Sequence, residues 1–150
     1  MISRQNHRDS RAMFTLHPQL AADTFAVTTL PLCEVRLMND SRFTWLILVP
    51  QRANIRELHQ LSSADQMQLL QESNALARHL EATGTPDKLN IAALGNLVPQ
   101  FHWHLVARTE DDPCWPGPVW GCGRAKPYDQ ATASAQVARL RKIIDMGEEQ

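Results

Sequence analysis

Several features that mark other protein classes are missing from this 150-residue chain. It has no apolar run of membrane-spanning length, since the longest one covers only residues 45–50. Its first 13 residues are polar and lack the apolar stretch of a signal peptide. The net charge is only −1, so no overall field attracts the chain to nucleic acid or to an anionic membrane. We therefore expect a cytoplasmic protein that binds neither nucleic acid nor membrane.

Cysteines and glycine motifs are scarce as well. The three cysteines, Cys33, Cys114 and Cys122, have no CxxC spacing, and reduced thiols fit this odd count best. Cys114 and Cys122 share one loop, and we expect a disulfide between them only occasionally. The chain also lacks the glycine fingerprints of P-loop and dinucleotide-binding proteins, which excludes those ways of binding a nucleotide. We expect neither a cofactor nor a bound metal.

What is present has the composition of a soluble globular protein, with 43% hydrophobic and 21% charged residues. The length favours one domain with a substantial core. We predict a loose tail over residues 1–13 and a single domain over residues 14–150. The core of that domain would cover residues 14–108, followed by a loop and a helix over residues 109–150.

Alternating apolar and polar residues predict the strands. The alternation is clear at residues 33–37, and the mostly apolar run at 43–49 favours a central strand that Pro50 ends. A turn of Asn, Asp, Ser and Arg joins these two strands into a hairpin, and a loop at 95–99 joins the strands of a second hairpin. The expected strands cover residues 24–28, 33–37, 43–49, 89–94 and 101–107.

Helical spacing predicts one long helix and one C-terminal helix. Ser63 and Gln66 fit a capping box at the start of the long helix, and Gly84 supplies its C′ position. The other helical segments are expected at residues 14–22, with an interruption at Pro18, at 55–61 and at 131–146. The sequence therefore predicts an α+β fold: an antiparallel sheet of about five strands with one long helix and a C-terminal helix.

The most informative stretch is residues 100–106, where apolar and polar residues alternate strictly. On a strand, Gln100, His102 and His104 would share one face, and Trp103 would belong to the core face. Neighbours on one face lie roughly 6.6 Å apart, two strand steps. Two imidazoles at that spacing can perform nucleophilic, acid–base or metal chemistry near neutral pH. The alternative is a solvated strand face that happens to carry two histidines.

A loop that starts with glycine, Gly95-Asn96-Leu97-Val98-Pro99, leads directly into this stretch. Such a loop can turn backbone N–H groups toward an anion. Phosphate beside two histidines indicates phosphoryl or nucleotidyl transfer. The alternative is that Gly95 simply permits a hairpin turn.

Residues 100–106 resemble the signature of the histidine triad (HIT) family of nucleotide hydrolases and transferases, His-φ-His-φ-His-φ-φ, where φ is apolar. His102 and His104 match the second and third histidines, and Gln100 replaces the first. The apolar strand at 43–49 and the order of hairpins are also similar to the family, and the resemblance covers about residues 14–108.

Two departures indicate a divergent, bacterial branch of the family. Ala53 and Asn54 stand where many members have a histidine, and Trp45 occupies the place of another histidine, that of a usual Gly-His pair. Together with Gln100, these residues distinguish the chain from the usual family pattern.

The resemblance implies a reaction at the α-phosphate of a purine nucleotide or nucleotide conjugate. His102 would be the nucleophile and form a nucleotidyl-histidine intermediate that water hydrolyses. The backbone carbonyl of Gln100 would hold Nδ1–H of His102, and His104 would donate to the phosphate. No metal is needed for this step.

The resemblance also assigns binding residues. Backbone N–H groups of Asn96, Leu97 and Val98, together with the Asn96 amide, would stabilise charge developing on phosphorus. Asn39 lies where members place a residue that holds the ribose, although a turn explains an asparagine there equally well.

Alternatives remain at this stage. One is a nucleotide-binding or regulatory protein of the same fold with little turnover, because Gln100 cannot relay protons as histidine does. Another is a zinc site on His102 and His104, for which no third ligand stands at characteristic spacing. The sequence does not specify the leaving group. One candidate is the second nucleotide of a dinucleoside polyphosphate. It predicts a homodimer, with the Trp/Pro-rich segment 111–127 covering part of the interface or of the pocket.

Overall fold

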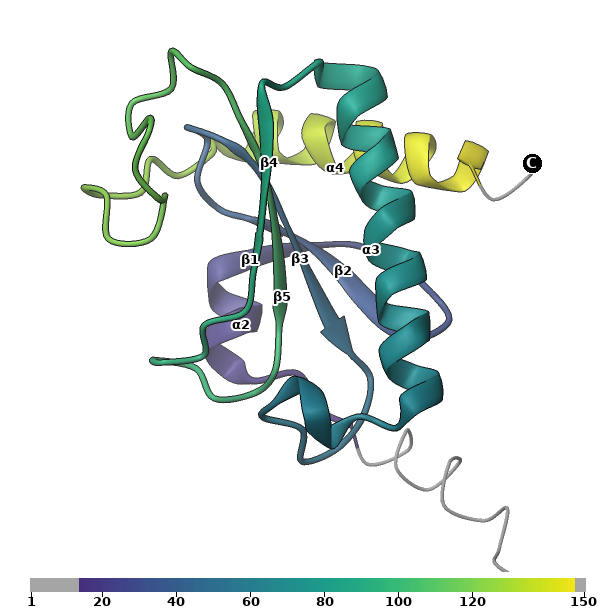
Figure 1. Cartoon of the computed structure of the whole chain (residues 1–150). Helices are drawn as coiled ribbons and strands as arrows, with labels where there is room; N and C mark the ends of the chain where they lie inside the picture. The colour runs from purple at the N-terminus through teal and green to yellow at the C-terminus, as the bar shows by residue number, and fades with distance from the viewer. Residues whose placement is uncertain (1–13, 148–150) are drawn as a thin grey trace, which may run out of the picture.

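An antiparallel sheet of five strands forms the centre of the described chain (Figure 1). The computed structural model describes residues 14–147, so the tail predicted at residues 1–13 lies outside them. The strands are β1 (Thr24–Thr29), β2 (Cys33–Met38), β3 (Thr44–Pro50), β4 (Lys88–Ala92) and β5 (Trp103–Arg108). They lie in the order β1-β2-β3-β5-β4, and each neighbouring pair is antiparallel. The predicted α+β fold is confirmed.

Strand β5 begins two residues later than the sequence predicts. Its first ladder partner is Leu48 of β3, opposite Trp103, and Ile47 lies opposite His104. Before that point the chain turns away, because the N–H of Phe101 donates to the carbonyl of Ile55, 2.9 Å away, and not to a strand. Residues 100–102 therefore lead into the sheet from outside its hydrogen-bond ladder.

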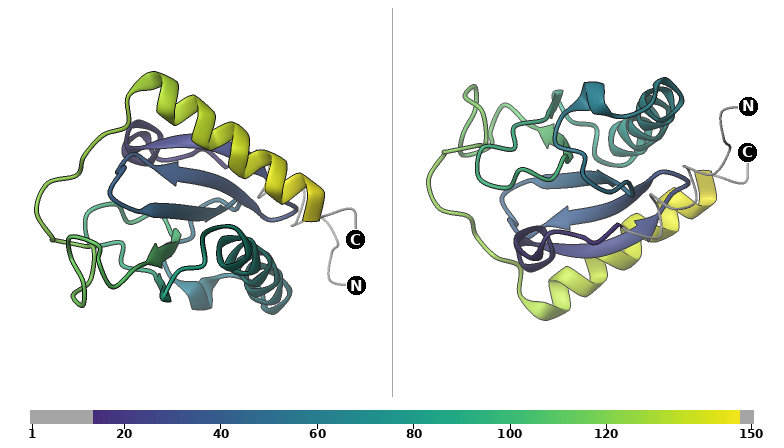
Figure 2. Two further views of the ribbon diagram at one scale, coloured as in Figure 1. Left: turned by 90° about the horizontal axis from the view of Figure 1, so that it is seen from above. Right: turned by 90° about the horizontal axis from the view of Figure 1, so that it is seen from below.

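Side chains alternate between the two faces of the central strands, and both faces are covered (Figure 2). Helices α3 (Ser63–Gly84) and α4 (Gln130–Gly147) cover one face, where their leucines pack on Leu46, Leu48 and Leu105. On the other face Ile47 and Val106 pack with the short helix α2 (Pro18–Asp23) and the loop at 109–129. Burial on both faces explains why β3 is apolar after Thr44 instead of alternating.

The helices occur where they are predicted, with different ends. Helix α2 begins at Pro18 and is not interrupted there, because proline suits the first turn of a helix. The N-cap of α3 is Ser62, one residue before the predicted box, and its hydroxyl accepts the N–H of Asp65. At the other end Thr85 adopts the left-handed conformation in place of Gly84, since the following proline disfavours right-handed helix at residue 85.

The remaining helical segments agree with the prediction. A single 3-10 turn, η1 (Leu58–Gln60), occupies the segment expected at 55–61, and α4 extends one residue beyond the expected 131–146 at each end. None of the helices described between residues 14 and 147 has the length and apolarity needed to cross a bilayer.

The expectation of reduced thiols is wrong for two of the cysteines. Cys114 and Cys122 form a disulfide, and Cys33 is free and buried in the core. A turn in which the N–H of Gly117 donates to the carbonyl of Cys114 reverses the chain and brings the two Cα atoms to 6.1 Å. An odd cysteine count does not reveal such a reversal. The cysteines therefore give no support to the predicted cytoplasmic location.

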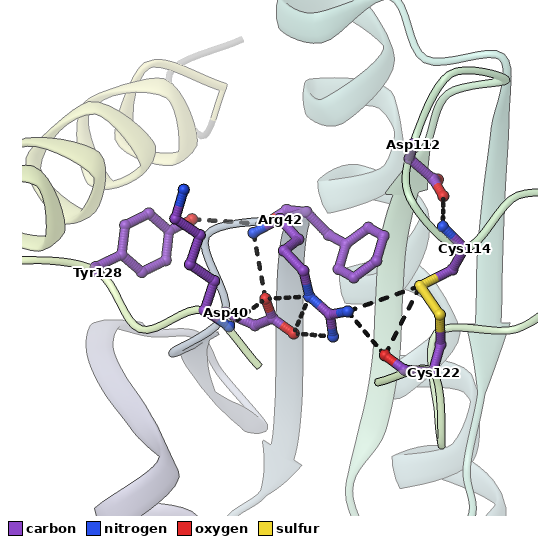
Figure 3. A network of polar contacts seen from close by, with 8 residues as sticks. Asp40, Arg42, Asp112, Cys114, Cys122 and Tyr128 are labelled. Atoms are coloured by element: carbon purple, nitrogen blue, oxygen red, sulfur yellow. Dashed lines mark hydrogen bonds and ion pairs between the residues drawn. A yellow bond between two sulfur atoms is a disulfide. The ribbon is translucent and has the colours of Figure 1, made fainter. Parts of the chain in front are cut away.

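Two arginines attach the disulfide-bonded loop to the sheet. Arg108, at the end of β5, is 1% exposed and donates to both carboxylate oxygens of Asp112 and to the carbonyl of Gly117. Arg42 pairs with Asp40 at 2.9 Å and donates to the carbonyl of Cys122 at 2.7 Å (Figure 3). The loop is thereby fixed over the face of the sheet opposite α3 and α4.

Candidate functional site

A pocket of about 440 Å³ lies on the face of the sheet that α2 and the disulfide-bonded loop cover. Residues from four separate segments line it. They are Leu20 and Asp23 of α2, Met38, Asp40, Arg42 and Trp45 around the β2–β3 hairpin, residues 94–98, 102 and 104, and residues 119–121, 123 and 125. The loop predicted to bind phosphate and both motif histidines are thus brought to one cavity.

His102 and His104 share the pocket face, as the alternation predicts. Their ring centroids lie 4.8 Å apart, and the residues are 8% and 3% exposed. Trp103 faces the opposite way, packs against the core, and donates from Nε1 to the hydroxyl of Ser73 on α3. The site therefore presents two closely spaced imidazoles that are largely shielded from water.

The protonation of His102 follows from its hydrogen bond. Nδ1 lies 2.7 Å from the backbone carbonyl of Gln100, and because a carbonyl can only accept, Nδ1 carries the proton. Burial lowers the pKa of His102, and the charge of His17 adds to that effect, while the hydrogen bond to Gln100 opposes it. A neutral His102 ring then has a free lone pair on Nε2, which is the form that a nucleophile requires.

His104 is neutral over the whole physiological pH range. Burial, together with the neighbouring His102, lowers its pKa to about 3. Its Nδ1 accepts a hydrogen bond from the indole Nε1 of Trp45 at 2.9 Å. His104 can therefore act as a hydrogen-bond donor in the pocket and not as a cation.

The side chain of Gln100 does not line the pocket. Its Oε1 accepts the N–H of His17 at 2.8 Å, and its Nε2 donates to the carbonyl of Thr15 at 2.9 Å. The sequence places this amide on the histidine face, but its hydrogen bonds to Thr15 and His17 hold it against the segment before α2 instead. Gln100 contributes its carbonyl to His102 and its amide to the segment before α2.

The loop before β5 lies at the mouth of the pocket. Gly95 has a φ of +76°, a conformation that other residues rarely adopt, and this explains the glycine. Asn96, Leu97 and Val98 all line the cavity, and the side chain of Leu97 is 96% exposed. Their position fits the predicted role in binding phosphate.

Asn39 is not among the lining residues. Its Oδ1 accepts the N–H of Tyr128 at 2.9 Å, so it fixes the chain that leads into α4. The neighbouring Asp40 lines the pocket instead. Burial alone would raise the pKa of Asp40, but hydrogen bonds from the Arg42 side chain and from backbone N–H groups lower it, so the carboxylate is ionised.

Sequence reasoning missed the aromatic wall of the pocket. The Trp120 ring lies edge-on to His104, with centroids 5.2 Å apart, and to Trp45, with centroids 5.8 Å apart. Val119 and Trp120 line the pocket and belong to the segment 111–127. The sequence predicts that this segment covers part of either the dimer interface or the pocket. The one signal for Trp45 in the sequence is its position two residues before Ile47, which puts both on one face of β3.

Within residues 14–147, no group of three or more His, Cys, Asp or Glu side chains is arranged to hold a metal ion. Nδ1 of His102 and Nδ1 of His104 are both engaged in hydrogen bonds within the protein. No feature of the described residues favours the zinc alternative.

Comparison with known proteins shows the family of the chain. The model of the HIT domain family matches residues 19–111, which contain both histidines. The chain belongs to the HIT family. A HIT protein from Sinorhizobium meliloti 1021 is 47% identical, with a TM-score of 0.85 over 88% of this chain and 98% of that one. A histidine triad protein from Marinobacter aquaeolei VT8 is 44% identical, with a TM-score of 0.86 over 89% and 98%.

More distant HIT structures share the fold alone. A zinc-bound histidine triad family protein from Mycobacterium smegmatis is 15% identical, with a TM-score of 0.62 over 87% of this chain and 92% of that one. No curated protein sequence matches the chain. Proteins with a HIT domain are commonly nucleotide hydrolases or transferases, which is the general class that the family supports for this chain.

Proposed function

We propose that this protein is a nucleotide hydrolase or nucleotidyl transferase that acts at the α-phosphate of a purine nucleotide or nucleotide conjugate. The observation that carries the proposal is the 2.7 Å contact of Nδ1 of His102 with the Gln100 carbonyl. It leaves Nε2 of His102 as a nucleophile inside a pocket that also holds His104 and the loop after Gly95.

The reaction has two displacements. In the first, Nε2 of His102 forms a bond to the α-phosphorus, and the bond from phosphorus to the leaving group breaks with its electron pair on the leaving group. In the second, a water oxygen forms the new bond to phosphorus and releases a proton to the solvent. The phosphorus–nitrogen bond breaks with its electron pair returning to Nε2 of His102, and the nucleoside monophosphate departs. The His104 ring and the N–H groups of Asn96, Leu97 and Val98 stabilise the charge that develops on the phosphoryl oxygens.

The charges around the pocket favour leaving groups that carry little negative charge. Arg42 is the one lysine or arginine among the lining residues that the structure describes, and Asp40 already neutralises it. Asp23 adds a negative charge at the same cavity. A polyphosphate leaving group would therefore meet no unpaired cation from these residues.

We expect kcat/KM for an adenosine phosphoramidate to exceed that for a diadenosine polyphosphate by about tenfold or more, the factor that about 1.4 kcal/mol in the transition state provides. Steady-state assays of both substrates at equal ionic strength measure this ratio. Faster cleavage of the polyphosphate would show that the pocket charges do not select the leaving group.

A second candidate is a nucleotide-binding protein with little turnover. It is favoured by one observation, the use of the Gln100 amide to hold Thr15 and His17, since the first motif position then offers no proton exchange. Calorimetry with a nucleoside monophosphate, combined with the same assays, separates the two candidates. Tight binding without cleavage of any substrate would support this second one.

We also propose that the protein is a homodimer. Strand β4 is an edge of the sheet, and a row of apolar side chains on and beside it is exposed: Ile91, Leu94 and Leu97. An isologous dimer that pairs two such edges would cover both the backbone groups and these side chains.

Light scattering at micromolar concentration should give about twice the 16.9 kDa mass of one chain. Ile91→Lys should shift the protein to the monomer, because it places two charges at the two-fold interface. Met146→Lys, at an exposed apolar residue of α4, is the control and should remain dimeric. A wild-type protein that scatters only as a monomer would contradict the pairing.

A further inference from the structure

We propose that Trp45 is a positioning residue that holds His104 in one tautomer, so that the ring presents Nε2–H to the pocket. The kinetic part of this inference rests on the function proposed above. Its structural part does not, because it concerns where a proton lies in the protein without substrate.

The argument starts from the chemistry of the two side chains. An indole nitrogen only donates, so the 2.9 Å contact between Nε1 of Trp45 and Nδ1 of His104 requires Nδ1 to be the acceptor. A neutral imidazole has one N–H, which must then be on Nε2. Protonation of Nδ1 would point two N–H groups at each other.

The surroundings of this pair make the alternative tautomer unfavourable. Trp45 is 6% exposed and His104 is 3% exposed, so their hydrogen bond is largely shielded from water. In the Nδ1–H tautomer the buried indole N–H would lose its acceptor, a loss that corresponds to a preference on the order of tenfold or more for Nε2–H. Trp45 and Trp120 pack against the His104 ring, with centroids 5.7 Å and 5.2 Å away, and hinder its rotation.

The fixed tautomer has a direct consequence for the proposed reaction. As His102 attacks, negative charge builds on the phosphoryl oxygens, and a donor already oriented in the pocket stabilises it without reorganisation. His104 lies 4.8 Å from His102 between ring centroids, close enough to serve the phosphate that His102 attacks. A free imidazole would spend part of its time with a lone pair, and not an N–H, toward the phosphate.

The proposal can be tested on the intact protein by NMR with ¹⁵N labelling. An N–H···N hydrogen bond transmits a scalar coupling, which we expect between Nε1 of Trp45 and Nδ1 of His104. The His104 ring should show a pyridine-type Nδ1 and a pyrrole-type Nε2 at pH 6 and at pH 8. His104→Gln assigns these signals. A pyrrole-type Nδ1 in the wild-type protein would overturn the proposal.

Two variants separate the hydrogen bond from the packing. Trp45→Phe keeps an aromatic ring but removes the N–H, and we expect His104 to populate the Nδ1–H tautomer measurably. Trp120→Phe changes the other indole that packs on His104, which donates no hydrogen bond to it, and the tautomer should stay as in the wild type. An unchanged tautomer in a folded Trp45→Phe protein would refute the role of Trp45. If this variant does not fold, the wild-type coupling decides.

Steady-state rates of the same variants then measure the effect on the reaction. Trp45→Phe should lower kcat by about tenfold with little change in KM, since the lost orientation matters most in the transition state. Trp120→Phe should not lower kcat selectively in this way. An altered tautomer with unchanged kcat would show that His104 does not need this orientation. Absence of turnover in the wild type would remove the proposed function and leave the NMR result standing.

Discussion

Replacing His102 by alanine should reduce turnover at least ~100-fold, the usual order for the loss of a nucleophile or acid–base group. The other imidazole in the pocket, that of His104, cannot substitute. The lone pair of its neutral ring lies on Nδ1 and already accepts a hydrogen bond from Trp45. The measurement is kcat with the best nucleotide substrate, together with a melting curve. The fold should persist, because the His102 side chain makes one hydrogen bond, to the Gln100 carbonyl, at the wall of a cavity.

The matched control for this variant is His59→Ala. His59 lies on the exposed turn η1 and is not among the residues that line the pocket, so its loss should leave turnover unchanged. Turnover at the wild-type level in folded His102→Ala would exclude His102 as the nucleophile.

Replacing Asp112 by asparagine should lower the free energy of unfolding at pH 7 by about 3 kcal/mol, as expected when one partner of a buried ion pair is neutralised. Arg108 is 1% exposed and donates to both Asp112 oxygens, at 2.7 Å and 3.1 Å. Urea denaturation of the wild type and the variant measures the difference. Asp111→Asn, at an exposed neighbour, is the control and should change stability by less than about 0.5 kcal/mol.

The same pair predicts a pH dependence. Hydrogen bonds from Arg108 lower the pKa of Asp112 from 3.8 to about 2. The pKa is depressed in the folded state, so this stabilisation is complete above the unfolded pKa of 3.8 and is lost as the pH falls to about 2. The difference in the free energy of unfolding between the wild type and Asp112→Asn should therefore decrease by about 2 kcal/mol as the pH falls from 5 to 2. A difference in unfolding free energy that stays constant with pH would show that Asp112 is not the titrating group.

Much of the fold follows from local patterns in the sequence. The alternation at residues 33–37 and the apolar run at 43–49 predict two strands, and helical spacing predicts α3 and α4. These patterns arise because burial on one or two faces of an element requires apolar residues at regular positions. The same alternation placed His102 and His104 on one face and Trp103 in the core. The periodicity still held for His102, which immediately precedes β5, but it did not hold for Gln100, farther from the strand.

The contacts that complete the site leave no such trace. Trp45 and His104 are 59 residues apart, Gln100 and His17 are 83 apart, and each contact depends on how separate segments are brought together. The Cys114–Cys122 disulfide depends on a chain reversal within an irregular loop. Side-chain chemistry at these positions is compatible with many partners, so only the fold selects the pair.

The measurement that tests the central claim most directly is the detection of a nucleotidyl group on His102. The protein is mixed with an aryl ester of a nucleoside monophosphate, whose good leaving group favours accumulation of the intermediate, and is denatured rapidly at alkaline pH. Mass spectrometry of the peptides should show one nucleotidyl group on His102 in the wild type and none in His102→Ala. Release of nucleoside monophosphate in this experiment, with the label on another residue or on none, would contradict the account.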